Sequence, residues 1–404
     1  MKKILYIVLD GLGDLEAAFT PNMDRLAQKG RTGLVYPVGR GIIPESDIAM
    51  ISLLSYDARE YYTGRGPLES FAAGVTVNDG DAAFRVNFAT VSEDGKTIID
   101  RRSGRSLTAD EASTLAKEIN SKVTLSSATF EFKNTVGHRG VLVIRGIRSK
   151  LSGRISNTDP TYDKEEVIES APIAGYEDSR EAKETACLLN EFILKSRKVL
   201  DGSPVNKKRV SEDKLPANMI LSRGAGDCLP KLPSINTLFN LKFGSFVRMP
   251  VEKGIALLAG MDIIDVPELT GHQDVDYSVW AKVVLGSIKE YDGIYVHIKG
   301  PDEPAHDGDS NKKKASIEEI DKFFFTSLLA GLDIDNTVIA VTSDYSTVCA
   351  ARAHSACPVP LLISGGNIKP DGSLSFSAKA ARHGSIGELS GRDIMPFLLK
   401  SAKD

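Results

Sequence analysis

Three short apolar runs in this chain each lead to an aspartate. Residues 4–9 precede Asp10, residues 294–298 precede Asp302, and residues 338–341 precede Asp344. Short runs of this kind, bounded by Gly, Pro and Asp, are typical of buried parallel strands. Because ligands bind at the carboxyl ends of the strands in an open α/β sheet, we expect the three carboxylates to gather at one edge. Crowded carboxylates repel one another, so the pattern predicts a metal-dependent enzyme.

The periodicity of the chain changes twice. Residues 1–64 alternate between predicted strands and helices, as in a parallel α/β sheet. The following segments are shorter, alternate with period two and are separated by Gly and Asp turns, which indicates an antiparallel α+β module. We therefore predict an α/β core domain, a mostly parallel sheet flanked by helices, from residues 1–64 and 181–404. A smaller α+β domain is expected to be inserted at residues 65–180.

Composition narrows the classes of function. The 404 residues carry a formal net charge of -4, which provides no basic footprint for nucleic acid. The 4 cysteines have no CxxC spacing and indicate a reducing compartment. Asp10 interrupts the N-terminal apolar run, and no apolar stretch is long enough to span a bilayer. We expect a soluble, cytoplasmic protein without a nucleic-acid or membrane partner.

Asp302 and His306 have the spacing of two metal ligands on one helical turn. Residues four apart lie on the same face of a helix, so the carboxylate and the imidazole can bind one divalent ion. His354, just before another predicted strand, is the candidate third ligand. A structural histidine with a local hydrogen bond is the alternative for each imidazole. The neighbouring strands and aspartates favour the metal site.

Ser46 precedes an apolar, helix-like stretch. Considered alone, this position favours an N-cap role, in which the hydroxyl accepts a backbone hydrogen bond. A hydroxyl at a helix N-terminus also lies in a positive potential, and a bound metal could hold it as an alkoxide for attack on phosphorus. The two roles do not exclude each other.

Gly11 and Gly13 follow the first predicted strand, as the first glycines of a dinucleotide fingerprint would. Position 16 is Glu instead of the third glycine, and the acidic residue Asp10 precedes the glycines instead of following them. We therefore expect no nucleotide cofactor.

Several motifs follow one another in a fixed order along the whole chain. They are Val-Leu-Asp-Gly-Leu-Gly at residues 8–13, and the segments 20–27, 64–66, 83–90, 100–105, 137–139, 223–226 and 358–363. With them, the chain resembles the archaeal-type, cofactor-independent phosphoglycerate mutases of the alkaline phosphatase superfamily. The resemblance implies an alkaline-phosphatase-like core and a substrate-orienting inserted domain. It also implies interconversion of 3-phosphoglycerate and 2-phosphoglycerate, in glycolysis and gluconeogenesis, without bisphosphoglycerate.

The same resemblance implies the catalytic group and its metal ions. Ser46 would be the nucleophile and carry the phosphoryl group as phosphoserine. One divalent ion would be bound by Asp302, His306 and His354, and a second by Asp10, Ser46 and Asp344. Ligands of these types favour Mn²⁺, with Zn²⁺, Co²⁺ or Mg²⁺ as alternatives.

A phosphoglycerate substrate requires cationic partners for its carboxylate and phosphate. Arginine suits this role because its planar guanidinium pairs with such anions through two hydrogen bonds. The candidates are Arg85, Arg102, Arg105, Arg139 and Arg223, together with His138 and Lys299. A solvated surface position is the alternative for each arginine. The sequence leaves a homo-oligomer open.

One position departs from the family pattern. Where the family has Asp-His-Ser-Thr, this chain has Tyr345 after Asp344. A neutral phenol, with a pKa near ~10, binds divalent ions poorly, so Tyr345 is a doubtful ligand and we expect weak occupancy of the metal site beside Ser46. Two alternative functions follow: a phosphatase or another phosphomutase of the same superfamily, or a paralogue that binds its ligand with little or no turnover.

Overall fold

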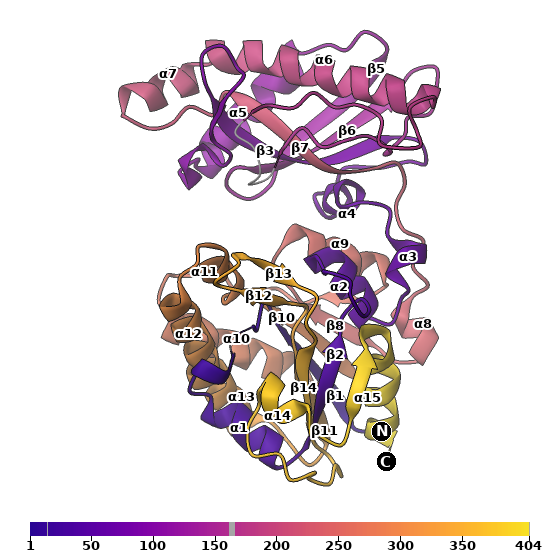
Figure 1. The fold of residues 1–404 in the computed structure, drawn as a ribbon, viewed down its shortest axis with the longest axis vertical. Helices are drawn as coiled ribbons and strands as arrows, with labels where there is room; N and C mark the ends of the chain where they lie inside the picture. The colour runs from indigo at the N-terminus through magenta and orange to yellow at the C-terminus, as the bar shows by residue number, and fades with distance from the viewer. Residues whose placement is uncertain (14, 161–165, 404) are drawn as a thin grey trace. The chain divides into compact units, whose positions relative to one another are not determined.

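The structure is a computed structural model and describes residues 1–13, 15–160 and 166–403. The chain divides into two compact units (Figure 1). Met1–Tyr62 and Lys231–Asp404 form the core unit, and Thr63–Pro230 form the inserted unit. Both ends of the chain therefore belong to the same unit.

An eight-stranded sheet runs through the described part of the core unit, in the order β15-β2-β14-β11-β1-β10-β8-β9. The central strand β1 pairs in parallel with β10 on one side and β11 on the other, whereas β14 is antiparallel to β11 and β2. The strands are β1 (Lys3–Leu9), β2 (Arg31–Tyr36), β8 (Phe243–Phe246), β9 (Asp262–Ile263), β10 (Gly293–Ile298), β11 (Thr337–Thr342), β14 (Val359–Gly365) and β15 (Gly387–Ser390). The predicted mostly parallel sheet is confirmed.

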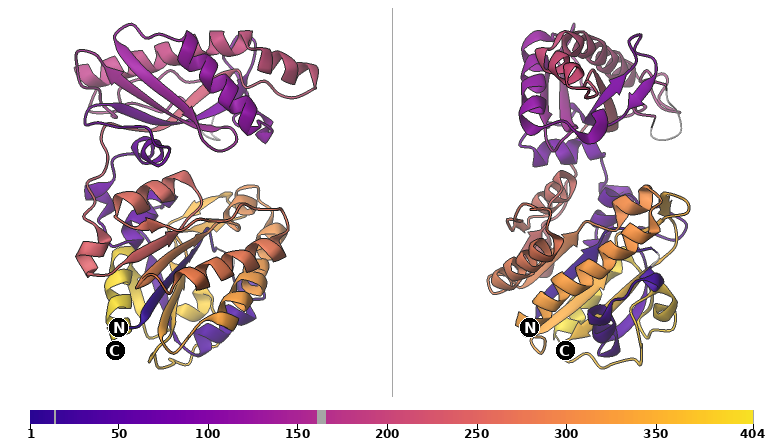
Figure 2. Two further views of the ribbon diagram at one scale, coloured as in Figure 1. Left: turned by 180° about the vertical axis from the view of Figure 1, so that it is seen from behind. Right: turned by 90° about the vertical axis from the view of Figure 1, so that its left-hand side faces the viewer.

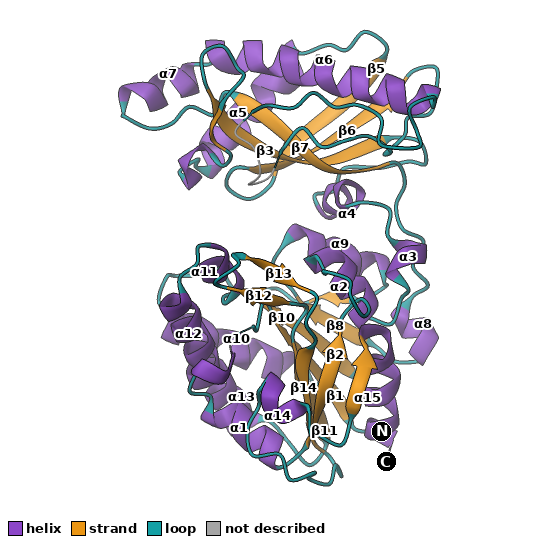
Figure 3. Cartoon of the chain, in the orientation of Figure 1, coloured by secondary structure: helices purple, strands orange, loops and turns teal. Residues whose placement is uncertain are grey.

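Helices cover both faces of this sheet (Figure 2, Figure 3). They are η1 (Leu15–Ala17), α1 (Pro21–Gln28), α2 (Ser46–Leu53), α3 (Ala58–Tyr61), α8 (Ile235–Phe239), α9 (Pro250–Leu258), α10 (Gln273–Ser287), α11 (Asp302–His306), α12 (Ser310–Glu319), η3 (Ile320–Phe325), α13 (Thr326–Gly331), α14 (Ala378–Ala381), η4 (Gly391–Asp393) and α15 (Ile394–Lys403). A short hairpin, β12 (Ser346–Val348) and β13 (Ala353–Ser355), follows β11. Among the described helices, none is long and apolar enough to cross a membrane.

The side chains of the central strand alternate between the two faces of the sheet. Leu5, Ile7 and Leu9 belong to the apolar cluster that includes residues of α1, α10 and η3. Tyr6 and Val8 therefore point to the opposite face, because successive side chains of a strand point in opposite directions. Asp10 continues this second series.

The described part of the inserted unit contains a five-stranded sheet, with β4-β3-β6-β5 in order and β7 paired to β3. Its elements are α4 (Arg65–Ala72), β3 (Ala82–Val91), β4 (Ile98–Asp100), η2 (Ser103–Arg105), α5 (Ala109–Lys122), β5 (Ala128–Asn134), β6 (Arg139–Gly146), α6 (Arg180–Gly202), α7 (Pro204–Ser211) and β7 (Met219–Gly226). Phe84 and Phe88 of β3 pack in one apolar cluster with Phe192 of α6. Ala83 of β3 lies in a separate apolar cluster on the opposite face, with Val141 and Val143 of β6.

The second boundary of the inserted unit differs from the prediction. The expected limit was residue 180, but the structure places α6, α7 and β7 in the inserted unit, up to Pro230. The physical reason is long-range pairing: β7 is antiparallel to β3, and α6 buries Leu189 and Phe192 against the same sheet. A helix followed by a strand has the same local pattern in either unit, so periodicity could not assign this segment.

Arg209 on α7 is fully buried and joins separate parts of the inserted unit. Its guanidinium donates to Glu111 Oε2 at 2.8 Å, Ser106 Oγ at 2.9 Å and the Leu215 carbonyl at 3.0 Å. Removal of the guanidinium would leave the oxygens of Glu111, Ser106 and Leu215 without this hydrogen-bond donor. We therefore expect Arg209→Met to lower the free energy of unfolding by about 3 kcal/mol.

Urea unfolding followed by circular dichroism measures this effect. Lys207→Met is the matched control, because Lys207 is an exposed residue of the same helix. It should change the free energy of unfolding by less than about 0.5 kcal/mol. An Arg209→Met effect as small as that of the control would contradict the prediction.

Candidate functional site

The predicted ligands Asp302, His306 and His354 lie together in the core unit. Their ligand atoms all lie within 4.8 Å of one another. Asp302 Oδ1 is 3.4 Å from His306 Nε2 and 3.6 Å from His354 Nε2. Asp302 and His306 belong to α11, directly after β10, and His354 belongs to β13. The structure thus brings together all three side chains that the sequence singled out.

Hydrogen bonds to the backbone hold both imidazoles in place. His306 Nδ1 is 2.9 Å from the Arg352 carbonyl, and His354 Nδ1 is 2.8 Å from the Pro44 carbonyl. Donation from Nδ1 to a carbonyl leaves Nε2 as the free lone pair, which is the arrangement of metal-binding histidines. The Thr347 hydroxyl also donates to Asp302 Oδ1 at 2.6 Å. The cluster therefore has the oriented outer contacts that a cation site requires.

The charge of Asp302 affects His354. Burial opposes protonation of this imidazole, but the hydrogen bond to Asp302 and its negative charge raise the pKa of His354 to about 9. A positive charge is thus favoured at this position. A cation bound here would replace that proton.

Asp10 and Asp344 meet in a second cluster, whose third member is His297. Asp10 follows β1, Asp344 follows β11, and His297 lies on β10 beside Val8 of β1. All three residues are at most 4% exposed, and His297 Nε2 is 3.3 Å from Asp344 Oδ2. The three aspartates at the ends of β1, β10 and β11 lie at one edge of the sheet, because these strands are parallel.

The two carboxylates of this second cluster differ electrostatically. Burial and the charge of Asp10 raise the pKa of Asp344. Burial has the same direction of effect on Asp10, but the ammonium of Lys299 outweighs it and lowers the pKa of Asp10. Two buried carboxylates side by side favour a bound cation.

Lys299 lies in the core unit, with Asp10, whereas the sequence grouped it with the arginines. Its Nζ is 2.5 Å from Asp10 Oδ2 and 3.1 Å from Glu252 Oε1. Glu252, on α9, is 2% exposed. These contacts hold the Lys299 ammonium beside the second cluster.

Ser46 is the first residue of α2, and Glu45 occupies the N-cap position. The alternative in which Ser46 acts as the N-cap is therefore wrong. Its side chain is 7% exposed, and Oγ lies 3.0 Å from the hydroxyl of Tyr345. The hydroxyl is thus available at the N-terminal end of a helix.

Tyr345 connects Ser46 to both clusters. Its ring stacks on His354, with centroids 3.8 Å apart and an interplanar angle of 20°. The charge of Asp10 also acts on its hydroxyl. Burial, followed by the charges of Asp10 and Asp344, raises the pKa of Tyr345 well above its usual value. The phenol therefore keeps its proton, which makes it a poor metal ligand.

The predicted arginines lie in the inserted unit. On its sheet, Arg85 of β3 is directly opposite Arg223 of β7, and Asn87 of β3 is opposite Arg139 of β6. Like charges opposite each other on neighbouring strands destabilise a sheet. Such an arrangement favours a functional role, the binding of an anion.

Arg85 is largely enclosed. Its side chain is 11% exposed, and its Nε is buried without a hydrogen-bond partner among the described residues. Burial and the charge of Arg65 lower the pKa of Arg85 to about 9, although Glu69, 3.7 Å away, acts in the opposite direction. A bound anion would satisfy this guanidinium.

Arg102 and Arg105 flank a left-handed turn. Ser103, Gly104 and Arg105 have φ angles of 47°, 67° and 52°. Such angles are unfavourable for residues other than glycine and persist where the surroundings enforce them. Arg209 donates to the Ser103 carbonyl at 3.4 Å, so the buried network described above supports this turn.

The pKa of His138 depends on the same group of cations. Burial, followed by the charges of Arg139, Arg102, Arg85 and Arg105, lowers the pKa of His138 to about 3. An anion bound among these arginines would offset their charge and favour the imidazolium. We therefore expect His138 to stay neutral at pH 6 in the free protein, and its pKa to rise when inorganic phosphate is added.

An NMR titration of the imidazole resonances measures this change. The chain has 6 histidines, and His138→Gln would assign the resonance. Exposed His383 serves as the internal control, because it lies outside the inserted unit. If the pKa of His138 stays the same at saturating phosphate, the anion site is somewhere else.

Four residues of these clusters were missed or misjudged in the sequence. His297 stands in the run before Asp302, but its position on a strand gave no sign that it faces Asp10 and Asp344. Arg65 and Glu69 act on Arg85 from α4, and Glu252 binds Lys299 from α9. The motif at residues 64–66 was the one feature that pointed to Arg65.

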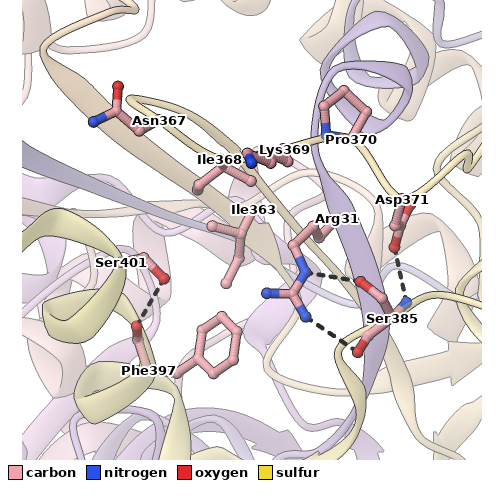
Figure 4. A pocket seen from close by; sticks show the side chains of 10 residues that line it. All are labelled: Arg31, Ile363, Asn367, Ile368, Lys369, Pro370, Asp371, Ser385, Phe397 and Ser401. Carbon is pink, nitrogen blue, oxygen red and sulfur yellow. Dashed lines mark hydrogen bonds between the residues drawn. The ribbon is translucent and has the colours of Figure 1, made fainter. Parts of the chain in front are cut away.

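The core unit also contains a hollow of about 530 Å³, and no residue of either cluster lines it. Figure 4 shows its lining residues. Its lining consists of Arg31, Ile363, Asn367, Ile368, Lys369, Pro370, Asp371, Ser385, Phe397 and Ser401. It adjoins the start of β2 and the end of β14. Because β14 is antiparallel to β11, this is the sheet edge opposite the three aspartates.

Comparisons with known proteins identify the family to which this chain belongs. Residues 27–206 match the family model described as 2,3-bisphosphoglycerate-independent phosphoglycerate mutase. A mutase of that name from Aeropyrum pernix is 43% identical, with 96% of each chain covered. The one from Thermococcus kodakarensis is 39% identical over 98% of this chain and 97% of its own.

Solved structures extend the similarity to the fold. A protein from Pyrococcus horikoshii has a TM-score of 0.81 and 31% identity, over 100% of this chain and 97% of its own. The cofactor-independent phosphoglycerate mutase from Thermoplasma acidophilum has a TM-score of 0.64 and 32% identity, over 100% of both chains. The chain thus belongs to the 2,3-bisphosphoglycerate-independent phosphoglycerate mutases.

Proposed function

We propose that this protein interconverts 3-phosphoglycerate and 2-phosphoglycerate through a phosphoserine at Ser46, without bisphosphoglycerate. One observation carries the proposal: Ser46 Oγ lies at the start of α2, 3.0 Å from the Tyr345 hydroxyl. Through Tyr345 it is connected to His354 of the first cluster and Asp10 of the second. A nucleophilic hydroxyl near cation sites suits phosphoryl transfer, in which cations stabilise charge on the entering and leaving oxygens.

Two divalent ions fit these clusters, and we propose Mn²⁺, with Zn²⁺, Co²⁺ or Mg²⁺ as alternatives. Asp302, His306 and His354 would hold one ion, because both imidazoles are already oriented by backbone carbonyls. Asp10, Asp344 and Ser46 would contribute to the other. When bound, such ions stabilise charge on the entering and leaving oxygens of the phosphoryl group.

The proposed reaction consists of two phosphoryl transfers, one to Ser46 and one from it. Ser46 Oγ forms a bond to phosphorus while the bond between phosphorus and the substrate oxygen breaks, and the proton lost by Ser46 Oγ ends on that released oxygen. The glycerate turns and its other hydroxyl forms a bond to phosphorus, while the bond between phosphorus and Ser46 Oγ breaks and the proton of that hydroxyl ends on Oγ. Lys299 supplies fixed positive charge beside Asp10.

The inserted unit would supply substrate recognition. Arg85, Arg139 and Arg223 face one another across its sheet, where their guanidinium groups can pair with a carboxylate or a phosphate. Arg102, Arg105 and His138 belong to the same electrostatic group. Retention of the glycerate by these residues would favour its rephosphorylation over loss to water.

The test is conversion of 3-phosphoglycerate by the metal-stripped full chain, with and without Mn²⁺ and with no bisphosphoglycerate. We expect no product without metal, and 2-phosphoglycerate without free phosphate when Mn²⁺ is added. Release of phosphate without isomerisation would instead indicate the phosphatase. Binding of phosphoglycerate without either product would indicate the catalytically silent paralogue. The proposed enzyme acts in the cytoplasm on this one small-molecule substrate, and sedimentation analysis would determine whether it forms a homo-oligomer.

A further inference from the structure

The second cluster of the core unit contains several buried polar atoms without partners. Both ring nitrogens of His297, Oδ2 of Asp344 and Oδ1 of Asp10 have no hydrogen-bond partner among the described residues. Buried polar groups are almost always hydrogen-bonded, and an exception calls for a physical explanation. One ring nitrogen of His297 and one oxygen of each carboxylate lie within 4.8 Å of one another, which indicates a common partner for these three atoms.

The chemistry of these atoms identifies the kind of partner. The carboxylate oxygens can only accept hydrogen bonds, and the imidazole nitrogen 3.3 Å from Asp344 Oδ2 can also offer a lone pair. Lys299 already occupies the other oxygen of Asp10, Oδ2, at 2.5 Å. A divalent cation is the partner that satisfies two carboxylates and an imidazole at once.

The strand pattern fixes the direction of His297. On β10, Ile294, Val296 and Ile298 belong to the apolar cluster on one face of the sheet. His297 has the opposite parity and therefore shares a face with Tyr6, Val8 and Asp10. Its side chain is 1% exposed, so burial restricts the orientation of the ring.

We propose that His297 is the nitrogen ligand of the divalent cation beside Ser46, together with Asp10 and Asp344. It takes the place that Tyr345 is unsuited to fill, since the phenol instead contacts Ser46 and stacks on His354. The proposal depends on the proposed function only for the presence of a divalent ion in this cluster. It replaces the expectation of weak occupancy, which considered Tyr345 alone.

Metal binding tests the proposal independently of catalysis. The metal-stripped full chain is titrated with Mn²⁺, and bound metal is measured after equilibrium dialysis. We expect two ions per wild-type chain. His297→Gln should retain one ion and bind the second at least about tenfold to a hundredfold more weakly. His383→Gln, which changes an exposed histidine, is the matched control and should bind as the wild type does.

A second substitution tests whether another imidazole can restore metal binding. Tyr345→His in the His297→Gln background offers an imidazole from the neighbouring position and should restore the second ion. If His297→Gln binds two ions as tightly as the wild type, or if the wild type binds only one, the proposal is overturned. Isomerase activity in the wild type would in either case leave the proposed function standing.

A spectroscopic measurement covers the outcome in which His297→Gln does not fold. The variant His306→Gln/His354→Gln has no imidazole in the first cluster. Mn²⁺ bound to this variant should still show a nitrogen coupling in electron spin echo modulation, from His297. A bound ion without nitrogen coupling would refute the assignment.

Discussion

Ser46→Ala should abolish the interconversion of the two phosphoglycerates, with a fall of about 10⁴-fold or more, because the proposed covalent transfer depends on this hydroxyl. The side chain is 7% exposed and its oxygen lies 3.0 Å from the Tyr345 hydroxyl. Because Glu45 is the N-cap, loss of the Ser46 hydroxyl removes no cap from α2. The variant should therefore fold normally and keep the ion held by Asp302, His306 and His354.

The assay follows formation of 2-phosphoglycerate and, separately, transfer of radioactive phosphate from substrate to protein. Ser52→Ala is the matched control, a buried serine near the other end of the same helix. It should keep both activities. Labelling of the Ser46→Ala protein, or more than about 1% of wild-type isomerisation, would show that another group receives the phosphoryl group.

Asp302→Asn should remove most of the activity as well, by about 10³-fold, because this carboxylate lies between two imidazoles. Oδ1 of Asp302 is 3.4 Å from His306 Nε2 and 3.6 Å from His354 Nε2. Its replacement by a neutral amide takes away the negative charge of the cluster. We expect loss of one bound Mn²⁺ per chain, measured by metal analysis after dialysis.

Two further substitutions test whether the loss of metal and activity is specific to Asp302 and its contacts. Thr347→Val removes the hydroxyl that donates to Asp302 at 2.6 Å, and should cost about tenfold to a hundredfold in metal affinity. Asp335→Asn changes an exposed carboxylate of the same unit and should have no effect. If Asp302→Asn retained its metal and activity, the first cluster would not be a cation site.

Much of this arrangement could be predicted from local patterns. The runs before Asp10, Asp302 and Asp344 specify buried strands, and parallel strands bring their carboxyl ends to one edge. The spacing of Asp302 and His306 specifies one helical turn. His354 was the candidate third ligand because it stands just before a predicted strand. The arginines were candidates because the substrate implied by the resemblance is an anion, and the structure places them in one unit.

Other features depend on contacts between residues far apart in the chain. The inserted unit reaches Pro230 because β7 pairs with β3, and no local pattern records which strand will be its neighbour. Lys299 lies beside Asp10 because Glu252 and Asp10 together hold its ammonium. The position of Ser46 relative to the helix start likewise became evident only in the folded chain.

His297 is an example in which the local sequence determined one property and long-range contacts determined another. The sequence by itself determined that it lies in a buried strand, since apolar residues surround it on both sides. Only the tertiary structure decided that this strand, β10, lies beside β1, and that β1 separates it from β11. This strand order brings the imidazole of His297 close to Asp10 and Asp344. Hydrophobic periodicity specifies which face of an element is buried, whereas the partners on that face are chosen by long-range packing.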